Sequence, residues 1–168
     1  EGLCTAFSHN YDIRVWAYRF ANIVGPHSTH GVIYDFTHRL LNEPNVLKVL
    51  GNGTQRKSYL HVQDCIEGMW FGYRNSHEPF QIFNLASYGV TNVAKIAEKV
   101  VARVAKQTGV KAKIEFGEGE RGWKGDVPYT HLEGALLEKL GWKAKLDSDQ
   151  AVELAIDQIV QEILEAKK

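Results

Sequence analysis

Basic side chains follow a glycine-rich turn in the stretch from residue 51 to residue 65. The stretch reads GNGTQRKSYLHVQDC, in which Arg56 and Lys57 follow two glycines and precede an alternating run that is typical of a short strand. A guanidinium gives forked hydrogen bonds to a phosphate, an ammonium gives a point charge, and glycine lets the backbone approach an anion closely. The stretch therefore indicates a local binding site for a diphosphate.

A second group of charged residues among glycines lies in EGERGWKGDVP, where Arg121, Lys124 and Asp126 occur close together. The two cations could contribute to the same diphosphate site, and the carboxylate could accept hydrogen bonds from ribose hydroxyls. Ordinary surface charges have the same spacing. The residues alone therefore leave a binding site and a solvated surface as open alternatives.

Residues 117–122, GEGERG, fit the glycine pattern of a dinucleotide site. That pattern binds a pyrophosphate only where a strand turns directly into a helix. Here Gly125 and Pro128 follow closely and oppose a helix, and Glu118 and Glu120 would repel phosphate. We therefore expect a loop that does not bind a cofactor.

His27 and His30 form a His-x-x-His pair that could belong to a metal site. Zinc needs a third and usually a fourth ligand at defined spacing, and the nearby sequence supplies no clear set. We expect a polar loop over a cleft and no metal, with a small metal hydrolase as the weaker alternative. A Ser-His-Asp hydrolase lacks support because there is no Gly-x-Ser-x-Gly motif.

The composition is that of an ordinary globular domain, with 168 residues, 44% hydrophobic and 24% charged. Lys plus Arg number 20 and Asp plus Glu number 20, so no general basic field exists to attract nucleic acid or an anionic membrane. No apolar run reaches the length of a spanning helix. We expect neither nucleic acid nor a membrane among the partners.

Cys4 and Cys65 are the only cysteines, and they are far apart in the sequence. This usage indicates a reducing cytoplasm and two free thiols. Residues 1–11 have helical apolar spacing but no initiator Met and no residue upstream that could cap a helix. We interpret the chain as a fragment of a longer cytoplasmic protein.

Strands and helices alternate along the chain, which predicts an α/β fold. Residues 12–20 have the β-branched and aromatic profile of a strand buried on both faces of a parallel sheet. Further strands are expected at residues 46–51, 59–62, 80–87 and 111–117.

Capping residues and apolar periodicity predict the helices after residue 31. One helix covers 32–42, and others begin at Asp64, Thr91, Thr130 and Asp147. The expected inward faces are Ile33, Phe36, Leu40 and Leu41; Ile66, Met69, Trp70 and Tyr73; Val93, Ile96, Ala97, Val100, Val101 and Val104; Leu132, Ala135, Leu136 and Leu140; and Val152, Ala155, Ile156, Ile159, Val160 and Ile163. Gly109 and Gly141 are expected to end two of these helices.

Several motifs in order resemble a known family. YRFANIVGP, HGVIYDF, LKVLGNGTQRKSYLHVQDC, FNLAS, RGWKGDVP and LGW are similar to the C-terminal half of the NAD-dependent nucleotide-sugar epimerase/dehydratase family. These proteins are the extended short-chain dehydrogenases that include UDP-glucose 4-epimerase. The resemblance runs over essentially the whole chain.

The resemblance implies the C-terminal part of a Rossmann-type protein, with the last parallel strands of the sheet and a small α/β substrate domain. Residues 1–25 and 62–88 would be the remnant of the NAD-binding domain, whereas 26–61 and 89–168 would bind the nucleotide sugar. The parent protein would be a homodimer that binds NAD mainly through the missing N-terminal half.

The resemblance also implies roles for individual residues. The backbone of Phe20 would meet the nicotinamide amide, and Asn22 would lie between cofactor and substrate and touch the substrate diphosphate. Val32 would contact the substrate, and the strand backbone at Lys48 and Leu50 would pair with the nucleotide base.

Four charged residues are carried over as substrate ligands, namely Arg56, Lys57, Arg121 and Asp126. Two of these positions depart from the family pattern. Lys57 stands where the family usually has Arg, so the charge is kept and the fork is lost. Arg121 is separated from Asp126 by Gly-Trp-Lys-Gly, whereas the family often has Arg-x-x-Asp or Arg-x-Gly-Asp.

The family's NAD phosphate loop and catalytic Tyr-x-x-x-Lys do not occur in this sequence, and we expect the catalytic residues upstream of Glu1. In the parent protein the tyrosine would act as base during transient oxidation of the sugar at C4, with NAD as hydride acceptor. The chain alone is expected to be inactive. The alternative is a non-catalytic nucleotide- or RNA-associated regulator with the same fold, which retention of Asn22, Lys57 and Asp126 disfavours.

Overall fold

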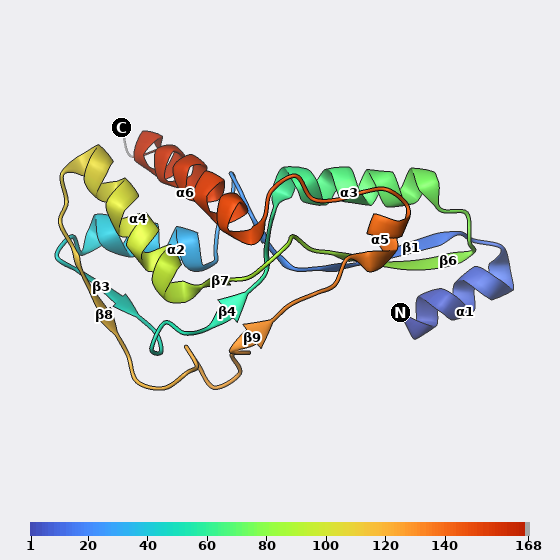
Figure 1. Ribbon diagram of the computed structural model, residues 1–168, viewed down its shortest axis with the longest axis horizontal. Coiled ribbons are helices and arrows are strands. Elements are labelled where there is room, and N and C mark those ends of the chain that lie inside the picture. The colour runs from blue at the N-terminus through green and yellow to red at the C-terminus, as the bar shows by residue number, and fades with distance from the viewer. Residues whose placement is uncertain (167–168) are drawn as a thin grey trace.

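Two parallel strands, β1 (Val15–Phe20) and β6 (Phe80–Leu85), form one end of the molecule. The computed structural model describes residues 1–166, so residues 167 and 168 of the expected substrate domain lie outside the described part. Helices α1 (Gly2–Tyr11) and α3 (Val62–Asn75) both contact this strand pair, as Figure 1 shows. The α/β class predicted from the sequence is confirmed.

The prediction that residues 12–20 form a strand buried on both faces is wrong. Strand β1 begins at Val15, is half-buried as far as Tyr18, and is exposed at Arg19 and Phe20. Its inner face is held by α3, because the Tyr18 hydroxyl donates to the Met69 carbonyl at 2.7 Å. Strand β6 pairs with one edge of β1, and among residues 1–166 no strand pairs with the other edge.

Helix α3 begins earlier than the sequence predicts. His61 is its N-cap and accepts a hydrogen bond from the Gln63 N–H, whereas Asp64 lies inside the first turn. The Asp64 carboxylate instead accepts the backbone N–H groups of Lys145 and Leu146. The aspartate therefore anchors a distant loop and does not cap its own helix.

The inward face of α3 also differs from the prediction. Ile66, Trp70 and Tyr73 are exposed, and the face that meets β6 is built around Gly68 and Gly72. A Cβ at Gly68 would lie 2.5 Å from the Leu85 side chain, so the helix approaches the strand too closely for larger residues. Of the four predicted residues, Met69 alone packs, partly buried, against this core.

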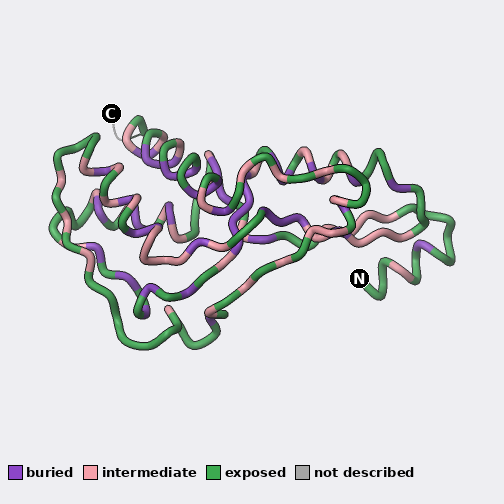
Figure 2. Tube along the Cα trace, in the orientation of Figure 1, coloured by how far each residue is buried: buried purple, intermediate pink, exposed green. Residues whose placement is uncertain are grey.

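Helices α2 (Val32–Asn42), α4 (Val93–Thr108) and α6 (Ser148–Glu165) pack together at the other end of the molecule. Strand β3 (Val46–Val49) pairs there with β8 (Lys113–Phe116) in parallel. Figure 2 shows buried residues along the facing sides of these helices. The predicted inward residues of α2, α4 and α6 lie in or against this core, with Leu41, Val93 and Val101 only partly buried.

The two long C-terminal helices are also joined by charges. Three cations on successive turns of α4 face three anions on successive turns of α6, giving ion pairs Lys95–Asp149, Lys99–Glu153 and Arg103–Asp157. Residues spaced by four lie on one helical face, so the pairs form a continuous ladder beside the core.

Two other predicted helix starts shift. Asn92 caps α4 by accepting the Lys95 N–H, while Thr91 lies in strand β7 (Thr91–Asn92) and hydrogen-bonds Ser148. Helix α5 (Ala135–Lys139) begins after Gly134, and Thr130 belongs to a strand. The predicted cap of α6 at Asp147 is confirmed, with Gln150 completing a capping box. Gly109 and Gly141 end α4 and follow α5 as predicted, both with positive φ.

The inward face of α5 also differs from the prediction. Leu137 is the fully buried residue of this short helix, whereas Leu136 and Leu140 are exposed. A helix of one turn and a half, begun five residues late, presents a different side to β6. The predicted inward face of this helix is therefore wrong at Leu136 and Leu140.

Three short strands connect the two ends of the molecule. Strand β4 (Arg56–Lys57) pairs antiparallel with β7 and parallel with β9 (Tyr129–Thr130). Beside it, β2 (Asn22–Val24) pairs in parallel with β5 (Tyr59–His61). These pairings bring residues that are distant in sequence to the middle of the molecule.

The state of the two cysteines agrees with the expectation of free thiols. Cys4 is exposed and Cys65 is buried, and both thiols are free. Within residues 1–166, none of the helices has the length and apolar character required to cross a bilayer.

Candidate functional site

Asn22 is held at the start of β2 by its neighbour β5. Its backbone N–H and its side-chain Nδ2 both donate to the Ser58 carbonyl, each at 3.1 Å. The preceding residue, Ala21, donates its N–H to Leu85 at the end of β6. Asn22 therefore lies where the carboxyl ends of β1 and β6 meet the smaller strands, which is the usual position of ligands in open α/β sheets.

Lys57 and Asp126 form an ion pair in the centre of the site. The Lys57 Nζ lies 2.7 Å from Asp126 Oδ1, and the Gly122 N–H donates to Asp126 Oδ2 at 3.0 Å. Burial raises the pKa of Asp126, but the hydrogen bonds from Lys57 and Gly122 outweigh it and lower the pKa below its ordinary value. Asp126 is therefore a carboxylate at neutral pH, and Lys57 is held by a full negative charge.

Tyr59 lies beside this pair and is buried. Burial, together with the charge of Asp126, raises the pKa of the Tyr59 phenol. The phenol keeps its proton throughout the neutral range. Tyr59 is therefore a hydrogen-bond donor or a packing residue and does not serve as a base.

Two adjoining hollows meet at Lys57. The first, which we call the Asn22 hollow, has a volume of about 560 Å³ and is lined by Asn22, Ser28, His30 and Tyr34 among others. The second, which we call the Trp123 hollow, has a volume of about 200 Å³. Its lining includes Leu50, Gln55, Val93, Gly122, Trp123 and Asp126. Val32, Lys57 and Tyr59 line both hollows.

The structure brings together five of the residues carried over from the family pattern. Asn22 lines the first hollow, Leu50 and Asp126 line the second, and Val32 and Lys57 line both. Asn22 and Asp126 therefore line different hollows, and Lys57 is the charged residue that lines both.

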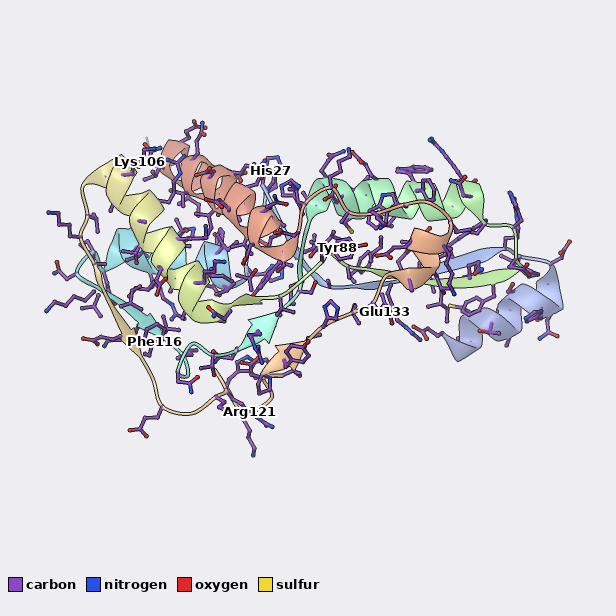
Figure 3. The ribbon with its side chains drawn as sticks, viewed as in Figure 1. His27, Tyr88, Lys106, Phe116, Arg121 and Glu133 are labelled. Atoms are coloured by element: carbon purple, nitrogen blue, oxygen red, sulfur yellow. The ribbon has the colours of Figure 1, made fainter. Side chains whose placement is uncertain are left out.

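Four other carried-over residues lie outside these hollows. Phe20 is exposed at the end of β1, and Lys48 lines a separate surface hollow beside Arg39. The Arg56 guanidinium lies over the Tyr129 ring, 5.5 Å from its centroid. Figure 3 places Arg121 at the outer edge of the loop that follows β8, where the residue is exposed.

The two alternatives that the sequence disfavoured have no geometric support. His27 is engaged by Glu162, with Nδ1 2.6 Å from Glu162 Oε1, and residues 1–166 contain no cluster of three or more metal-ligating side chains. The glycine stretch 117–122 opens no helix, and its Gly117 N–H donates to Val49 and Gly51. It packs against the end of β3 and does not form a dinucleotide loop.

Gln55 and Trp123 are residues of the site that the sequence analysis missed. Gln55, Lys57 and Tyr59 are spaced by two along an extended segment and all line the Trp123 hollow. Alternate residues of a strand share one face, so this period of two was the signal that could have found Gln55. Trp123 lies in the interval between Arg121 and Asp126 that is longer than in the family pattern.

Solved structures with a similar fold include sugar-nucleotide epimerases. A UDP-galactose 4-epimerase is 33% identical with a TM-score of 0.81, over 97% of this chain and 51% of that chain. A UDP-glucose 4-epimerase from Thermotoga maritima, solved with UDP-glucose, is 21% identical with a TM-score of 0.76, over 96% and 51%. The chain matches about half of such extended short-chain dehydrogenases, which fits the C-terminal part implied by the sequence motifs.

Sequence comparison gives the same result. Mouse dTDP-D-glucose 4,6-dehydratase is 20% identical over 161 residues, which are 94% of this chain and 44% of that protein. The model of the NAD dependent epimerase/dehydratase family matches residues 1–86, more than half of the chain. Because this model covers more than half of the chain, the chain belongs to the NAD dependent epimerase/dehydratase family.

Proposed function

We propose that this chain is the substrate-binding portion of an NAD-dependent nucleotide-sugar epimerase or dehydratase and that it binds a nucleotide-diphosphate sugar. The observation that carries the proposal is the position of Lys57 at the junction of two hollows. A nucleotide sugar has its diphosphate between two larger groups, and a cation between two hollows matches that order of charge and volume.

The diphosphate is assigned to Lys57 and Asn22. An ammonium has three N–H donors, and Asp126 takes one of those of Lys57, which leaves two for phosphate oxygens. Asn22 Nδ2 has a second N–H besides the one that Ser58 accepts. Hydrogen bonds to charged groups are the stronger kind, so few contacts suffice to fix the anion.

In this proposal, residues 1–25 and 62–88 belong to the NAD-binding part, and residues 26–61 and 89–168 form the substrate-binding part. Phe20, exposed beside Asn22 at the carboxyl end of β1, suits a contact with the nicotinamide end of the cofactor. No glycine-rich strand-to-helix turn for its phosphates occurs within the described residues, so most of the cofactor contacts would come from elsewhere. NAD, when bound, supplies the hydride acceptor.

Because the sequence has no Tyr-x-x-x-Lys, we expect binding without turnover by this chain alone. Isothermal titration calorimetry with UDP-glucose and with a GDP sugar tests the binding. We expect Lys57→Ala to weaken the affinity about 10- to 100-fold, because the variant loses the cation and a charge-assisted hydrogen bond to the diphosphate. The matched control is Lys113→Ala, an exposed lysine on β8 away from both hollows.

If wild-type and Lys57→Ala protein bind the nucleotide sugar with equal enthalpy and equal affinity, the assignment of the diphosphate to Lys57 is contradicted. Absence of heat from wild-type protein at millimolar concentrations of both nucleotide sugars would contradict binding altogether.

A further inference from the structure

Residues 25–31, which we call the 25–31 loop, connect β2 to α2 and form part of the wall of the Asn22 hollow. Ser28 and His30 are among the loop residues that line it. The start of the loop is fixed by close packing, because a Cβ at Gly25 would lie 2.6 Å from the Val62 side chain. The shape of this wall therefore depends on what holds the rest of the loop.

Glu162 of α6 holds the middle of the loop through two atoms of one residue. Glu162 Oε2 accepts the His27 backbone N–H at 2.8 Å, and Glu162 Oε1 lies 2.6 Å from His27 Nδ1, beside the label of His27 in Figure 3. Within residues 1–166, the other hydrogen bonds of residues 26–30 stay inside the segment 25–30. The Glu162 carboxylate is therefore the polar link between the middle of the loop and a distant element.

The charge state of Glu162 suits this role. The hydrogen bond from the His27 backbone N–H is the largest of the effects that hold the pKa of the Glu162 carboxyl below its ordinary value. The group is therefore a carboxylate at neutral pH, and both of its oxygens are acceptors.

The backbone of His27 needs such a link. Its φ is 63°, in the left-handed region that residues with a side chain rarely adopt. A residue stays in this region only when its surroundings hold it there. Glu162 holds His27 at the backbone and at the ring together. We expect the loop to leave this conformation more often when the carboxylate is absent.

Glu162 itself stands on a part of α6 that is fixed in the core. Ile159 and Ile163, which precede and follow it on the helix, are both buried. Ile159 also lines the Asn22 hollow, and residues three apart lie on one face of a helix. This face of α6 therefore forms the wall of the hollow directly through Ile159 and supports it indirectly through the 25–31 loop.

We infer that Glu162 is a positioning residue that holds the 25–31 loop as the sugar-side wall of the nucleotide-sugar site. The inference rests on the proposed function. Leu50, which the family resemblance assigns to the base, lines the Trp123 hollow, so the sugar end of the ligand falls to the Asn22 hollow. Apparent affinity decreases with the fraction of protein in the binding-competent conformation. Loss of the carboxylate should therefore weaken the contribution of the sugar and leave that of the nucleoside diphosphate.

Calorimetry of wild-type, Glu162→Ala and Glu162→Gln protein tests this by comparing UDP-glucose with UDP, and a GDP sugar with GDP. Glu162→Ala should weaken binding of the nucleotide sugar about 3- to 10-fold, because the loop forms the wall for a smaller fraction of the time. Binding of the nucleoside diphosphate should be unchanged. Glu162→Gln should retain most of the affinity, since its amide oxygen can accept the His27 N–H and its amide N–H can donate to Nδ1.

The matched control is Glu165→Ala. This glutamate lies on the same helix, and its carboxylate accepts a hydrogen bond from Gln161 of that helix. We expect the control to bind the nucleotide sugars and the nucleoside diphosphates as the wild-type protein does.

Hydrogen exchange supplies a second readout that needs no ligand. The amides of residues 27–31 should exchange faster in Glu162→Ala than in wild-type or Glu162→Gln protein. The amides of α4 should keep their protection, which shows that the variant is folded. Unchanged exchange of the loop in Glu162→Ala would overturn the positioning role.

The binding data separate failure of this inference from failure of the proposed function. Equal affinity of wild-type and Glu162→Ala protein for the nucleotide sugar would overturn the positioning role and leave the proposed function standing. An equal loss for nucleotide sugar and nucleoside diphosphate would do the same, since Glu162 would then act on the site as a whole. Equal wild-type affinity for the two ligands would also overturn it, because the sugar would make no contribution. If wild-type protein binds neither nucleotide sugar, the proposed function and the inference fail together.

Discussion

Lys57 and Asp126, which are 69 residues apart in the sequence, lie in contact, with Nζ 2.7 Å from Oδ1. The carboxylate side is 6% exposed and the ammonium side 24%, so water screens this pair less than a surface pair. The contact holds the cation at the junction of the two hollows and ties the loop of Trp123 to strand β4.

Replacing Asp126 by Asn tests that contact through its pH dependence. We expect Asp126→Asn to lower the free energy of unfolding by about 1–3 kcal/mol at pH 7, because a charge-assisted hydrogen bond is lost. The pKa of Asp126 is lowered by folding, so its contribution is present above the ordinary aspartate pKa and is lost as pH falls through the folded-state value. Urea unfolding of both proteins between pH 7 and pH 3 measures the difference, which should shrink below about pH 4. A difference that stays constant over this range would contradict the ion pair.

The close approach of α3 to β6 predicts an unusual effect at Gly68. Alanine favours helix, yet Gly68→Ala should destabilise the protein by about 1–3 kcal/mol, because the new Cβ would lie 2.5 Å from Leu85 and 2.8 Å from Trp142. Ile66→Ala, on the exposed side of the same helix, should change stability by less than about 0.5 kcal/mol. Chemical denaturation of both variants provides the comparison. A larger loss at Ile66 than at Gly68 would restore the apolar stripe that the sequence predicted.

This case shows why the face of α3 could not be predicted. Hydrophobic periodicity registers large apolar residues, and it gives no weight to glycines whose value is the space they leave for a neighbouring strand. In α6, by contrast, the predicted aspartate cap and the predicted inward residues from Val152 to Ile163 agree with the structure, because large apolar residues fill the core there.

The candidate site likewise has some features that the sequence predicts and others that it does not. Lys57 and Asp126 were found individually from their residue types and from the family motifs, but their contact depends on the pairing of β4 with β9. No local pattern encodes the pairing of two-residue strands. Gln55 belongs to none of the charged groups or family motifs that indicate the site, although its alternation with Lys57 is present in the sequence.

The charge ladder between α4 and α6 predicts a reciprocal substitution. Lys99→Glu places like charges opposite each other and should lower the free energy of unfolding by about 1 kcal/mol at low salt. The exchange Lys99→Glu with Glu153→Lys should restore most of that loss, and both effects should diminish at high salt. Thermal or chemical denaturation of the four proteins of the cycle measures the coupling. Failure of the exchanged pair to recover stability would show that Lys99 acts through packing of its chain.

The two thiols should differ in reactivity. Burial raises the pKa of the Cys65 thiol, and the residue is 5% exposed, whereas Cys4 is exposed on α1. A colourimetric disulfide reagent at pH 8 should modify one thiol rapidly in the folded protein, and two after denaturation. Cys4→Ser should remove the rapid phase. Rapid modification of both thiols in the native state would show that α3 opens readily.

Strand β4 has only two residues, Arg56 and Lys57, and it pairs with β7 on one side and with β9 on the other. These backbone pairings determine which of the two cations faces the hollows. The Arg56 N–H donates to Pro128 and the Ser58 N–H donates to Thr130, so the alternation of the strand directs Lys57 inward and Arg56 toward Tyr129. A slip of one position would exchange a point charge for a planar fork. The chemical nature of the anion receptor is thus decided by main-chain registration as much as by the choice of amino acid.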